Sequence, residues 1–256
     1  MSAMQLAEPV AASWKAELSL NFRRDAARTV LEKRFAGPLV VQKALYPDGP
    51  ELCHAIVVHP PGGIANGDEL TLSAACEADA RALITTPGAG KWYRSAGAWA
   101  RQTLDFNVQG SLEWLPRETI VFDGALADLK SRVSLKQGAR YVGWEVLSLG
   151  RFRRGRMKIN TRIMQEGRPL FIEKGEIEGG GRLMRSPVGL GGRSVVGTLL
   201  ATHEGKVDVP GIAITRLPGL LVARYLGDSS EEALQGFTRV WKALRPSAVE
   251  PRIWST

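Results

Sequence analysis

Short segments in which apolar and polar residues alternate recur along most of this sequence. Near the N-terminus, Leu18, Leu20 and Phe22 alternate with polar neighbours. A period of two places the apolar side chains on one face of an extended chain, so each such segment predicts a half-buried β-strand. Turn-forming residues separate the segments at intervals of about eight to twelve residues, a spacing typical of all-β folds. The sequence therefore predicts a mostly β protein built from many short strands.

The other strand candidates show the same alternation or are short apolar segments between turns. One of them, 141–147, contains an acid, Glu145, among apolar residues. If that side chain is buried, it needs a partner or its pKa rises. Another candidate, 156–163, places four polar residues on one face and predicts a polar column on a half-buried strand. The remaining candidates are 16–22, 29–35, 39–41, 55–58, 70–76, 80–86, 104–108, 112–114, 120–122, 133–135, 169–177 and 213–226.

One segment near the C-terminus has the helical period instead. Ser229 is followed three residues later by Glu232, which is a capping-box signature, and Pro246 ends the pattern. Apolar residues recur between these positions at steps of three and four, so we predict an amphipathic helix over about 229–245. Its apolar face either packs on the protein's own sheet, which we favour, or provides a docking face for a partner.

Two connections concentrate residues that set backbone shape. The segment 59–70 holds two prolines and three glycines, so it predicts a loop of defined shape that delivers Asp68 and Glu69 to the start of a strand. The segment 86–95 holds Lys91 in a glycine-rich loop, but its spacing fits neither a phosphate-binding loop nor the dinucleotide fingerprint. We therefore exclude nucleotide binding at this loop.

The composition limits the compartment and the partners. The chain has 256 residues, a formal net charge of +8 and a pI near 9.8, which favours an acidic protein surface or nucleic acid as a partner. Its two cysteines form no disulfide framework, and its N-terminus shows no secretory signal. No apolar segment approaches the roughly 18 residues of a membrane helix. We expect a soluble cytoplasmic protein without a membrane partner, with one domain over 1–256 and a frayed end at 1–13.

Motifs that carry chemistry are scarce. The three histidines have no metal-binding spacing, and no Gly-x-Ser-x-Gly nucleophile motif occurs. A hydrolase built on Asp68 and Glu69 lacks a nucleophile or a set of metal ligands, so we expect no enzyme and no catalytic residues. The densest basic segment, 151–158, leaves a nucleic-acid-binding β domain as the alternative function. Neither an aromatic platform nor a recognition helix accompanies this segment, which makes nucleic acid a weak candidate.

Several longer strings are together more specific than these patterns. They are Cys53-His54, His59-Pro-Pro-Gly-Gly63, Gly67-Asp-Glu-Leu70, Thr86-Pro-Gly-Ala-Gly-Lys91, Tyr93-Arg-Ser95, Glu113-Trp-Leu-Pro116, Val196-Gly-Thr-Leu-Leu200, Trp241, Leu244-Arg-Pro246 and Arg252-Ile-Trp254. With them, the chain resembles the UreD (also called UreH) family of urease accessory proteins from about residue 14 to residue 256. The resemblance implies a stacked, β-helix-like arrangement of strands with a small C-terminal helical part.

The resemblance also implies a non-catalytic role in urease maturation. Members of the family bind the urease apoprotein and join a helical scaffold subunit and a GTPase accessory protein. The resulting complex helps to deliver nickel to the buried urease site. An internal, water-filled passage is associated with the family as a route for the metal. Nickel in transit needs weak and incomplete oxygen or imidazole ligation, so we expect transient Ni²⁺ and no tightly bound cofactor.

Carried over position by position, the resemblance implies three groups of functional residues. The metal-transit acids fall on Asp68, Glu145 and Glu173. Passage or loop support falls on His59, Glu69 and Lys91, and partner docking on Trp241, Arg245, Arg252 and Trp254. Two positions depart from the family pattern. Asn66 stands where relatives often have glycine, which a left-handed backbone tolerates. Gly90 stands where serine is frequent, which puts a hydroxyl contact beside Lys91 in doubt.

Overall fold

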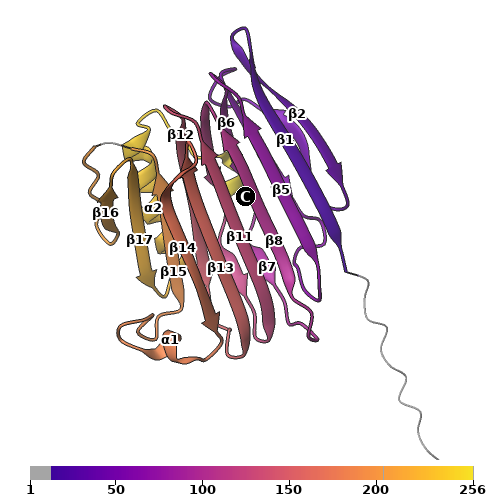
Figure 1. Cartoon of the computed structure of the whole chain (residues 1–256), viewed down its shortest axis with the longest axis vertical. Coiled ribbons are helices and arrows are strands. Elements are labelled where there is room, and N and C mark those ends of the chain that lie inside the picture. The colour runs from indigo at the N-terminus through magenta and orange to yellow at the C-terminus, as the bar shows by residue number, and fades with distance from the viewer. Residues whose placement is uncertain (1–12, 204, 256) are drawn as a thin grey trace, which may run out of the picture.

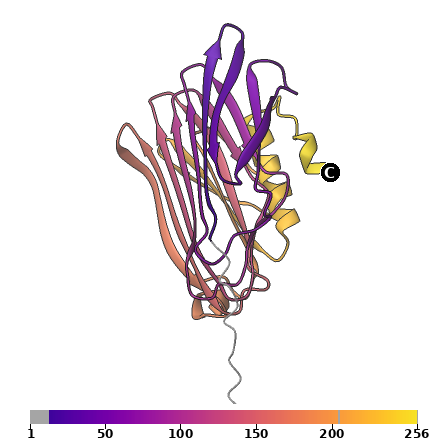
Figure 2. The ribbon, with the colours of Figure 1, turned by 90° about the vertical axis from the view of Figure 1, so that its right-hand side faces the viewer.

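Two β-sheets lie face to face and make up most of the molecule (Figures 1 and 2). The structure, a computed structural model, describes residues 13–203 and 205–255. The predicted frayed end at 1–13 therefore lies, except for Ser13, outside the described residues. Helix α2 (Ser230–Leu244) packs against the outer face of one sheet, and the short 3-10 helix η1 (Arg252–Ser255) follows it.

The seven strands of the first sheet, sheet A, lie in the order β14-β13-β11-β8-β5-β1-β2. They are β1 (Lys15–Asp25), β2 (Arg28–Ala36), β5 (Glu69–Cys76), β8 (Ala100–Val108), β11 (Ala125–Leu135), β13 (Gly155–Gln165) and β14 (Arg168–Glu178). A four-residue helix, α1 (Arg182–Arg185), lies in the connection that leaves β14.

The second sheet, sheet B, has ten strands, of which eight follow the order β16-β17-β15-β12-β9-β6-β4-β3. They are β3 (Val40–Leu45), β4 (Leu52–Val58), β6 (Arg81–Thr85), β9 (Ser111–Leu115), β12 (Arg140–Ser148), β15 (Val195–Ala201), β16 (Ala213–Leu217) and β17 (Leu220–Gly227). The short strands β7 (Gly90–Trp92) and β10 (Thr119–Val121) pair with each other, and β10 also pairs with β12.

From β4 to β13 the chain alternates between the two sheets and winds as a solenoid. In sheet A, β1, β5, β8, β11 and β13 run parallel, and in sheet B, β4, β6, β9 and β12 do so. Each coil adds one strand to each sheet, so equivalent residues of successive coils stack. Leu18, Leu72 and Leu104, for example, are aligned partners. The predicted mostly β, β-helix-like arrangement with a small C-terminal helical part is confirmed.

Apolar side chains from both sheets fill the space between them, as the period of two predicts. In β1, Leu18, Leu20 and Phe22 are buried. A second apolar layer lies between sheet B and α2, where Phe237 and Trp241 are fully buried. Strand β12 is therefore covered on both faces, which explains why its sequence is almost continuously apolar.

Helix α2 begins where the capping box predicts. The hydroxyl of Ser229 accepts a hydrogen bond from the backbone N–H of Glu232 at 3.1 Å. The carboxylate of Glu232 accepts a hydrogen bond from the Tyr225 hydroxyl at 3.0 Å, which ties the first turn of the helix to β17. The apolar face of α2 packs against β12, β15 and β17. Packing on the protein's own sheet, the alternative that we favour from the sequence, is thus the observed one.

One predicted strand is much too short. The sequence pattern indicates a strand only over 133–135, whereas β11 begins at Ala125. The inward residues at its start are Ala125 and Ala127, both fully buried. Alanine is small and only weakly apolar, so the alternation is faint there. Burial in this part of β11 depends on the neighbouring coils rather than on the local sequence.

Candidate functional site: a polar passage between the sheets

One row of inward-facing positions changes character halfway across sheet A. Leucines occupy this row in β1, β5 and β8, ending with Leu104. In the next three strands the aligned positions are Ser131, Thr161 and Glu173. This inward row is therefore apolar near β1 and polar near β14.

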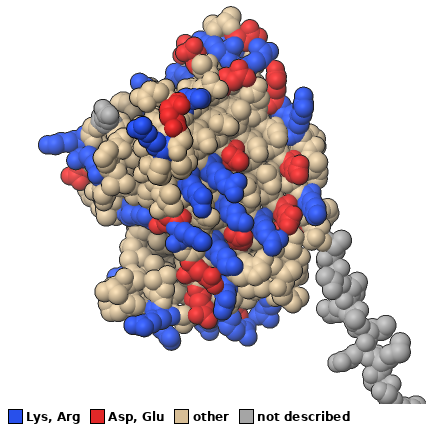
Figure 3. Space-filling model, in the orientation of Figure 1, with Lys and Arg blue, Asp and Glu red and all other residues tan. Residues whose placement is uncertain are grey.

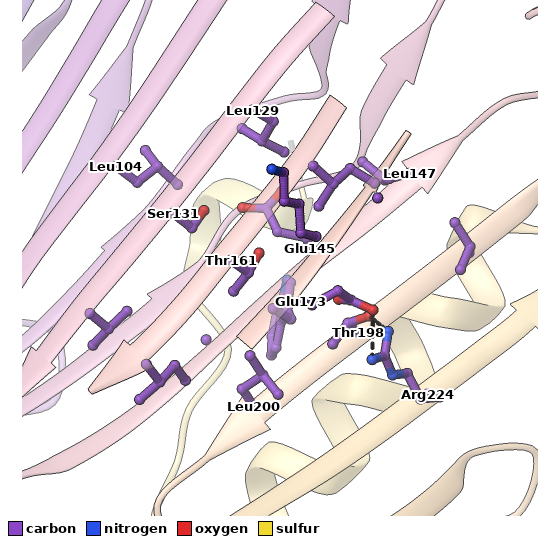
Figure 4. Close-up of a pocket in the computed structure, with 18 of the residues that line it drawn as sticks. Leu104, Leu129, Ser131, Glu145, Leu147, Thr161, Glu173, Thr198, Leu200 and Arg224 are labelled. Atoms are coloured by element: carbon purple, nitrogen blue, oxygen red, sulfur yellow. Dashed lines mark hydrogen bonds and ion pairs between the residues drawn. The ribbon is translucent and has the colours of Figure 1, made fainter. Parts of the chain in front are cut away.

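A second polar row faces the first from sheet B. Glu145 of β12, Thr198 of β15 and Arg224 of β17 are aligned partners on adjacent strands. Both rows line one cavity of about 240 Å³, and their side chains converge in it (Figure 4). Neither row forms a local sequence motif, because the solenoid register brings its members together.

The carboxyl of Glu145 lies at the inner end of this cavity. Its Oε1 accepts a hydrogen bond from the indole Nε1 of Trp114 at 3.1 Å. Burial raises the pKa of Glu145 to about 7, and the hydrogen bond from Trp114 opposes that rise. This carboxyl is therefore roughly half ionised near neutral pH. The sequence predicts that a buried Glu145 has either a partner or a raised pKa. The structure shows the partner, Trp114, and burial raises the pKa as well.

A tyrosine hydroxyl lies next to Glu145 because the strand leaves space for it. Tyr141 and Gly143 line the same cavity as Glu145. A Cβ atom on Gly143 would lie only 2.1 Å from the Tyr141 hydroxyl oxygen. Glycine at this position thus lets the tyrosine ring lie over the strand. Burial and the nearby Glu145 charge both raise the pKa of Tyr141, so this hydroxyl stays protonated.

An ion pair between Glu173 and Arg224 lies at the outer end of the cavity, where β14 faces β17. The Nη2 atom of Arg224 lies 2.8 Å from Oε1 of Glu173. Its Nη1 atom donates a hydrogen bond to the hydroxyl of Thr198 at 2.6 Å (Figure 4). The side chains of Arg224 and Glu173 are 38% and 35% exposed, so solvent reaches this end of the passage.

A second cavity, of about 320 Å³, adjoins the first. Leu104 and Trp114 line both cavities, so these side chains form the wall that the two spaces share. The far end of the second cavity is formed by the loops that follow β4 and β6, which contribute His59, and by β7, which contributes Lys91. The two cavities together form what we call the passage, from the Glu173–Arg224 pair to these loops.

The two loops are held together by backbone pairing. The N–H of Ile64 donates to the carbonyl of Lys91 at 2.9 Å, and the N–H of Tyr93 donates back to Ile64 at 3.0 Å. Asn66 has a φ of 45°, and its side-chain oxygen accepts from the N–H of Ala96 at 2.6 Å. The predicted loop of defined shape is confirmed. Asn66 adopts a left-handed backbone conformation, which asparagine tolerates better than most residues do.

The imidazole of His59 is the one aromatic nitrogen base among the predicted passage residues. Its Nε2 atom is buried and makes no hydrogen bond within the described residues. Burial lowers the pKa of His59, while the Asp68 charge opposes that fall, so the ring is neutral at physiological pH. A neutral imidazole nitrogen without a partner is a possible ligand for a borderline metal ion such as Ni²⁺.

Comparison with known proteins identifies the family. Residues 15–255 match the family described as UreD urease accessory protein. The chain belongs to the UreD family. It is 46% identical to urease accessory protein UreD of Dechloromonas aromatica (strain RCB), with 95% of each chain covered. It is also 46% identical to the UreD of Azoarcus sp. (strain BH72), covering 100% of this chain and 98% of the relative. Identity to the UreD of Nitrosococcus oceani is 41%, over 95% of this chain and 91% of the relative.

Asp68, predicted as a metal-transit acid, and Glu69, predicted as passage or loop support, do not line either of the two cavities. Asp68 accepts backbone hydrogen bonds on both carboxylate oxygens, from Trp14 at 2.7 Å and from Ala65 at 2.8 Å. Its structural role is to shape the loop. Glu69 pairs with Arg101 at 2.9 Å on the outer face of sheet A. The transit role of Asp68 and the supporting role of Glu69 stay predictions.

Two of the four predicted docking residues are enclosed within the chain. Trp241 is fully buried against sheet B. Arg245 pairs with Glu113, with Nε 2.9 Å from Oε1, and with Asp48 at 3.4 Å. Both side chains attach α2 to sheet B, so neither offers a free surface to a partner. The helical period does not predict this, because it cannot distinguish a face that packs internally from one that docks.

The other two docking residues lie closer to the surface. Arg252 is exposed on η1. Trp254 is half-buried, its Nε1 donates to the Thr85 hydroxyl at 2.9 Å, and its ring packs near Trp144 and Trp241. Docking through this end of the UreD-family chain stays a prediction, with Arg252 as its accessible residue.

The outer face of sheet A mixes positive and negative side chains (Figure 3). Aligned outward residues alternate in sign across five strands, in the order Glu69, Arg101, Asp128, Lys158 and Glu176. Within the basic segment 151–158, Arg154 lies 2.6 Å from Asp123 and Arg156 lies 3.5 Å from Glu176. This alternation gives no support to the nucleic-acid alternative, which needs a continuous basic surface.

The sequence did not predict several residues of the passage. Four of them are ordinary polar residues in segments of alternating pattern, namely Ser131, Thr161, Thr198 and Arg224. The sequence pattern indicates that Trp114 is a core residue. The available signal was the strand register, since polar residues replace leucine at one inward row over three consecutive strands. Using that signal requires the number of residues in each coil of the solenoid, which sets the strand register.

Among the described residues, no helix combines the length and apolar content needed to span a membrane.

Proposed function

We propose that this chain is a cytoplasmic, non-catalytic urease maturation factor that binds apo-urease and conducts Ni²⁺ through its interior. It acts with a helical scaffold subunit and a GTPase accessory protein. Membership of the UreD urease accessory protein family supports the maturation role. The observation that carries the nickel route is the pair of facing polar rows, which join Glu173 to Glu145 inside an otherwise apolar core.

The chemistry of the passage suits a cation that moves. Glu145 and Glu173 offer carboxylate oxygens, and Ser131, Thr161 and Thr198 offer hydroxyl oxygens along the same cavity. Single oxygen ligands at successive positions bind Ni²⁺ weakly, which permits release. With a pKa of about 7, Glu145 exchanges a proton for a metal ion at small cost near neutral pH. At the far end of the passage, His59 adds an imidazole and Lys91 adds a counter-charge that discourages tight binding.

Urease activation in cells tests the nickel route. Apo-urease and the other accessory proteins are co-expressed with wild type, Glu145→Gln or Glu173→Gln, and a pull-down checks the complex. Glu69→Gln is the matched control, because Glu69 lies on the outer face of sheet A. Lost activation with an intact complex in the two passage variants supports the proposal. Normal activation in both variants, or in cells that lack this protein altogether, would overturn it.

A point substitution tests docking of the scaffold subunit at the C-terminal end. Deleting the chain after Asp228 would remove α2 and expose the buried face of sheet B, so loss of binding would have no clear cause. Arg252→Glu reverses one exposed charge and leaves α2 in place. We expect weaker capture of the helical scaffold subunit by this variant. Lys206→Glu, an exposed charge reversal in the loop between β15 and β16, is the control.

A further inference from the structure

The outer end of the passage is occupied by a positive charge of the protein itself. Arg224 places its guanidinium between the carboxylate of Glu173 and the hydroxyl of Thr198, at 2.8 Å and 2.6 Å. Both oxygen groups line the cavity at this end and are potential ligands for a cation. A divalent cation and the guanidinium therefore compete for the same place.

The strand register holds Arg224 in this position. Arg224 continues the inward row of Glu145 and Thr198 onto β17, so its side chain lines the cavity between the sheets, although 38% of it is exposed. The ring of Phe171 on β14 lies 5.9 Å from the guanidinium and limits its movement on one side. The arginine is thus part of the cavity wall in the described structure.

The pair is also of a kind that opens readily. Its two side chains are more than a third exposed, and ion pairs with such exposure contribute little to stability. The Arg245–Glu113 pair differs, because its side chains are only 14% and 8% exposed. Separating these two groups would leave a buried charge without a partner. The fold places the weak ion pair at the mouth of the passage and the strong one under α2.

We propose that Arg224 is a cation gate at the outer end of the passage. It neutralises Glu173 and excludes divalent cations while the protein is free, and the passage admits a cation at this end only when the guanidinium leaves the carboxylate. This inference rests on the proposed nickel route and adds to it a residue that decides when the route is open. Arg224 is a positioning residue here, since it acts through Glu173.

Nickel binding by the purified full-length chain tests the gate without urease. Equilibrium dialysis against Ni²⁺ alone compares wild type with Arg224→Met, which keeps the side-chain length and removes the charge. We expect the Kd for Ni²⁺ to fall by about tenfold, because Glu173 becomes free to bind a cation. Adding Glu173→Gln to Arg224→Met should return the Kd to the wild-type value. An unchanged Kd in a folded Arg224→Met protein would overturn the gate.

Two further variants keep the test decisive. Arg193→Met removes an arginine from a comparable surface pair, with Asp228 at 2.6 Å, that lies off the passage, and it should leave nickel binding unchanged. Arg224→Gln also removes the charge but keeps a neutral hydrogen-bond donor beside Thr198, and it should lower the Kd as Arg224→Met does. If Arg224→Met fails to fold, an unchanged Kd in Arg224→Gln overturns the proposal.

Urease activation separates failure of the gate from failure of the nickel route. If Arg224→Met binds nickel as wild type does while Glu145→Gln still abolishes urease activation, the route stands and the gate is wrong. If Arg224→Met binds nickel more tightly but urease activation proceeds without this protein, Arg224 controls a nickel-binding site and the proposed function in urease maturation is wrong.

Discussion

The indole of Trp114 donates a hydrogen bond to Glu145 over 3.1 Å at the junction of the two internal cavities. An ion that moves from one cavity to the other passes this contact. The same hydrogen bond favours the charged form of Glu145, whereas burial favours the neutral form. The junction therefore combines the side chains that both cavities share with the carboxyl whose pKa is raised to about 7.

Glu145→Gln is expected to change how stability depends on pH. The pKa of Glu145 is about 7 in the folded chain against 4.5 for an ordinary glutamate, so the folded state binds the proton more tightly. The stability that this proton provides is present below pH 4.5 and is lost as the pH rises through about 7. Relative to Glu145→Gln, wild type should lose up to about 3 kcal/mol between pH 4.5 and 8.

Urea denaturation of both proteins across this pH range measures the difference. Glu32→Gln is a useful control, because the hydrogen bond from Arg23 lowers the pKa of Glu32 from its ordinary 4.5, so its stability difference changes only below that pH and stays flat from pH 4.5 to 8. A stability difference between wild type and Glu145→Gln that does not vary with pH would contradict a buried carboxyl with a raised pKa.

Trp114→Phe should shift the Glu145 titration upward. The substitution removes the only indole donor to Glu145 among the described contacts and keeps an aromatic ring in place. Because that hydrogen bond lowers the pKa of Glu145, its loss raises the pH at which the stability difference from Glu145→Gln develops. Stability at neutral pH should fall by about 1 kcal/mol. An unchanged midpoint of the pH transition would mean that the hydrogen bond is absent in solution.

Ser131→Leu should block the passage without unfolding the protein. It extends onto β11 the leucine row of β1, β5 and β8, and the adjoining cavity of about 240 Å³ has room for the larger side chain. We expect a change in stability below about 1 kcal/mol and a clear loss of urease activation with the complex intact. Ser134→Leu, on the outward face of the same strand, is the matched control and should activate urease normally.

Arg245→Met should be strongly destabilising. It leaves the carboxylates of Glu113 and Asp48 buried without their guanidinium partner, a change that costs about 3–5 kcal/mol. The cost should shrink at low pH, since burial already raises the pKa of Glu113 and Arg245 opposes that rise. Urea denaturation at pH 7 and pH 5 provides the measurement.

Lys242→Met serves as the comparison for Arg245→Met. Lys242 pairs with Glu250 at 2.6 Å, but its side chain is 44% exposed, so we expect a loss of no more than about 1 kcal/mol. Equal losses in the two variants would show that Arg245 does not attach α2 to sheet B as the geometry indicates.

The sequence by itself determined the local elements. The period of two predicted most strands, the Ser229 capping box placed the start of α2, and the proline and glycine content predicted the shaped loop at 59–70. Each of these follows from neighbouring residues alone, because strand faces, helix caps and turns are set within a few positions of the chain. The anomalous Glu145 was also visible, as an acid in an apolar segment.

Only the tertiary structure decided which residues share the passage. Thr161, Glu173 and Arg224 meet because the coils stack in register and the two sheets face each other, and the lengths of the connecting loops set that register. The same long-range packing buried Trp241 of α2 against sheet B and turned Glu69 to the outer face. Local patterns assign a residue to a face of a strand or helix, but what covers that face depends on elements far away in the chain.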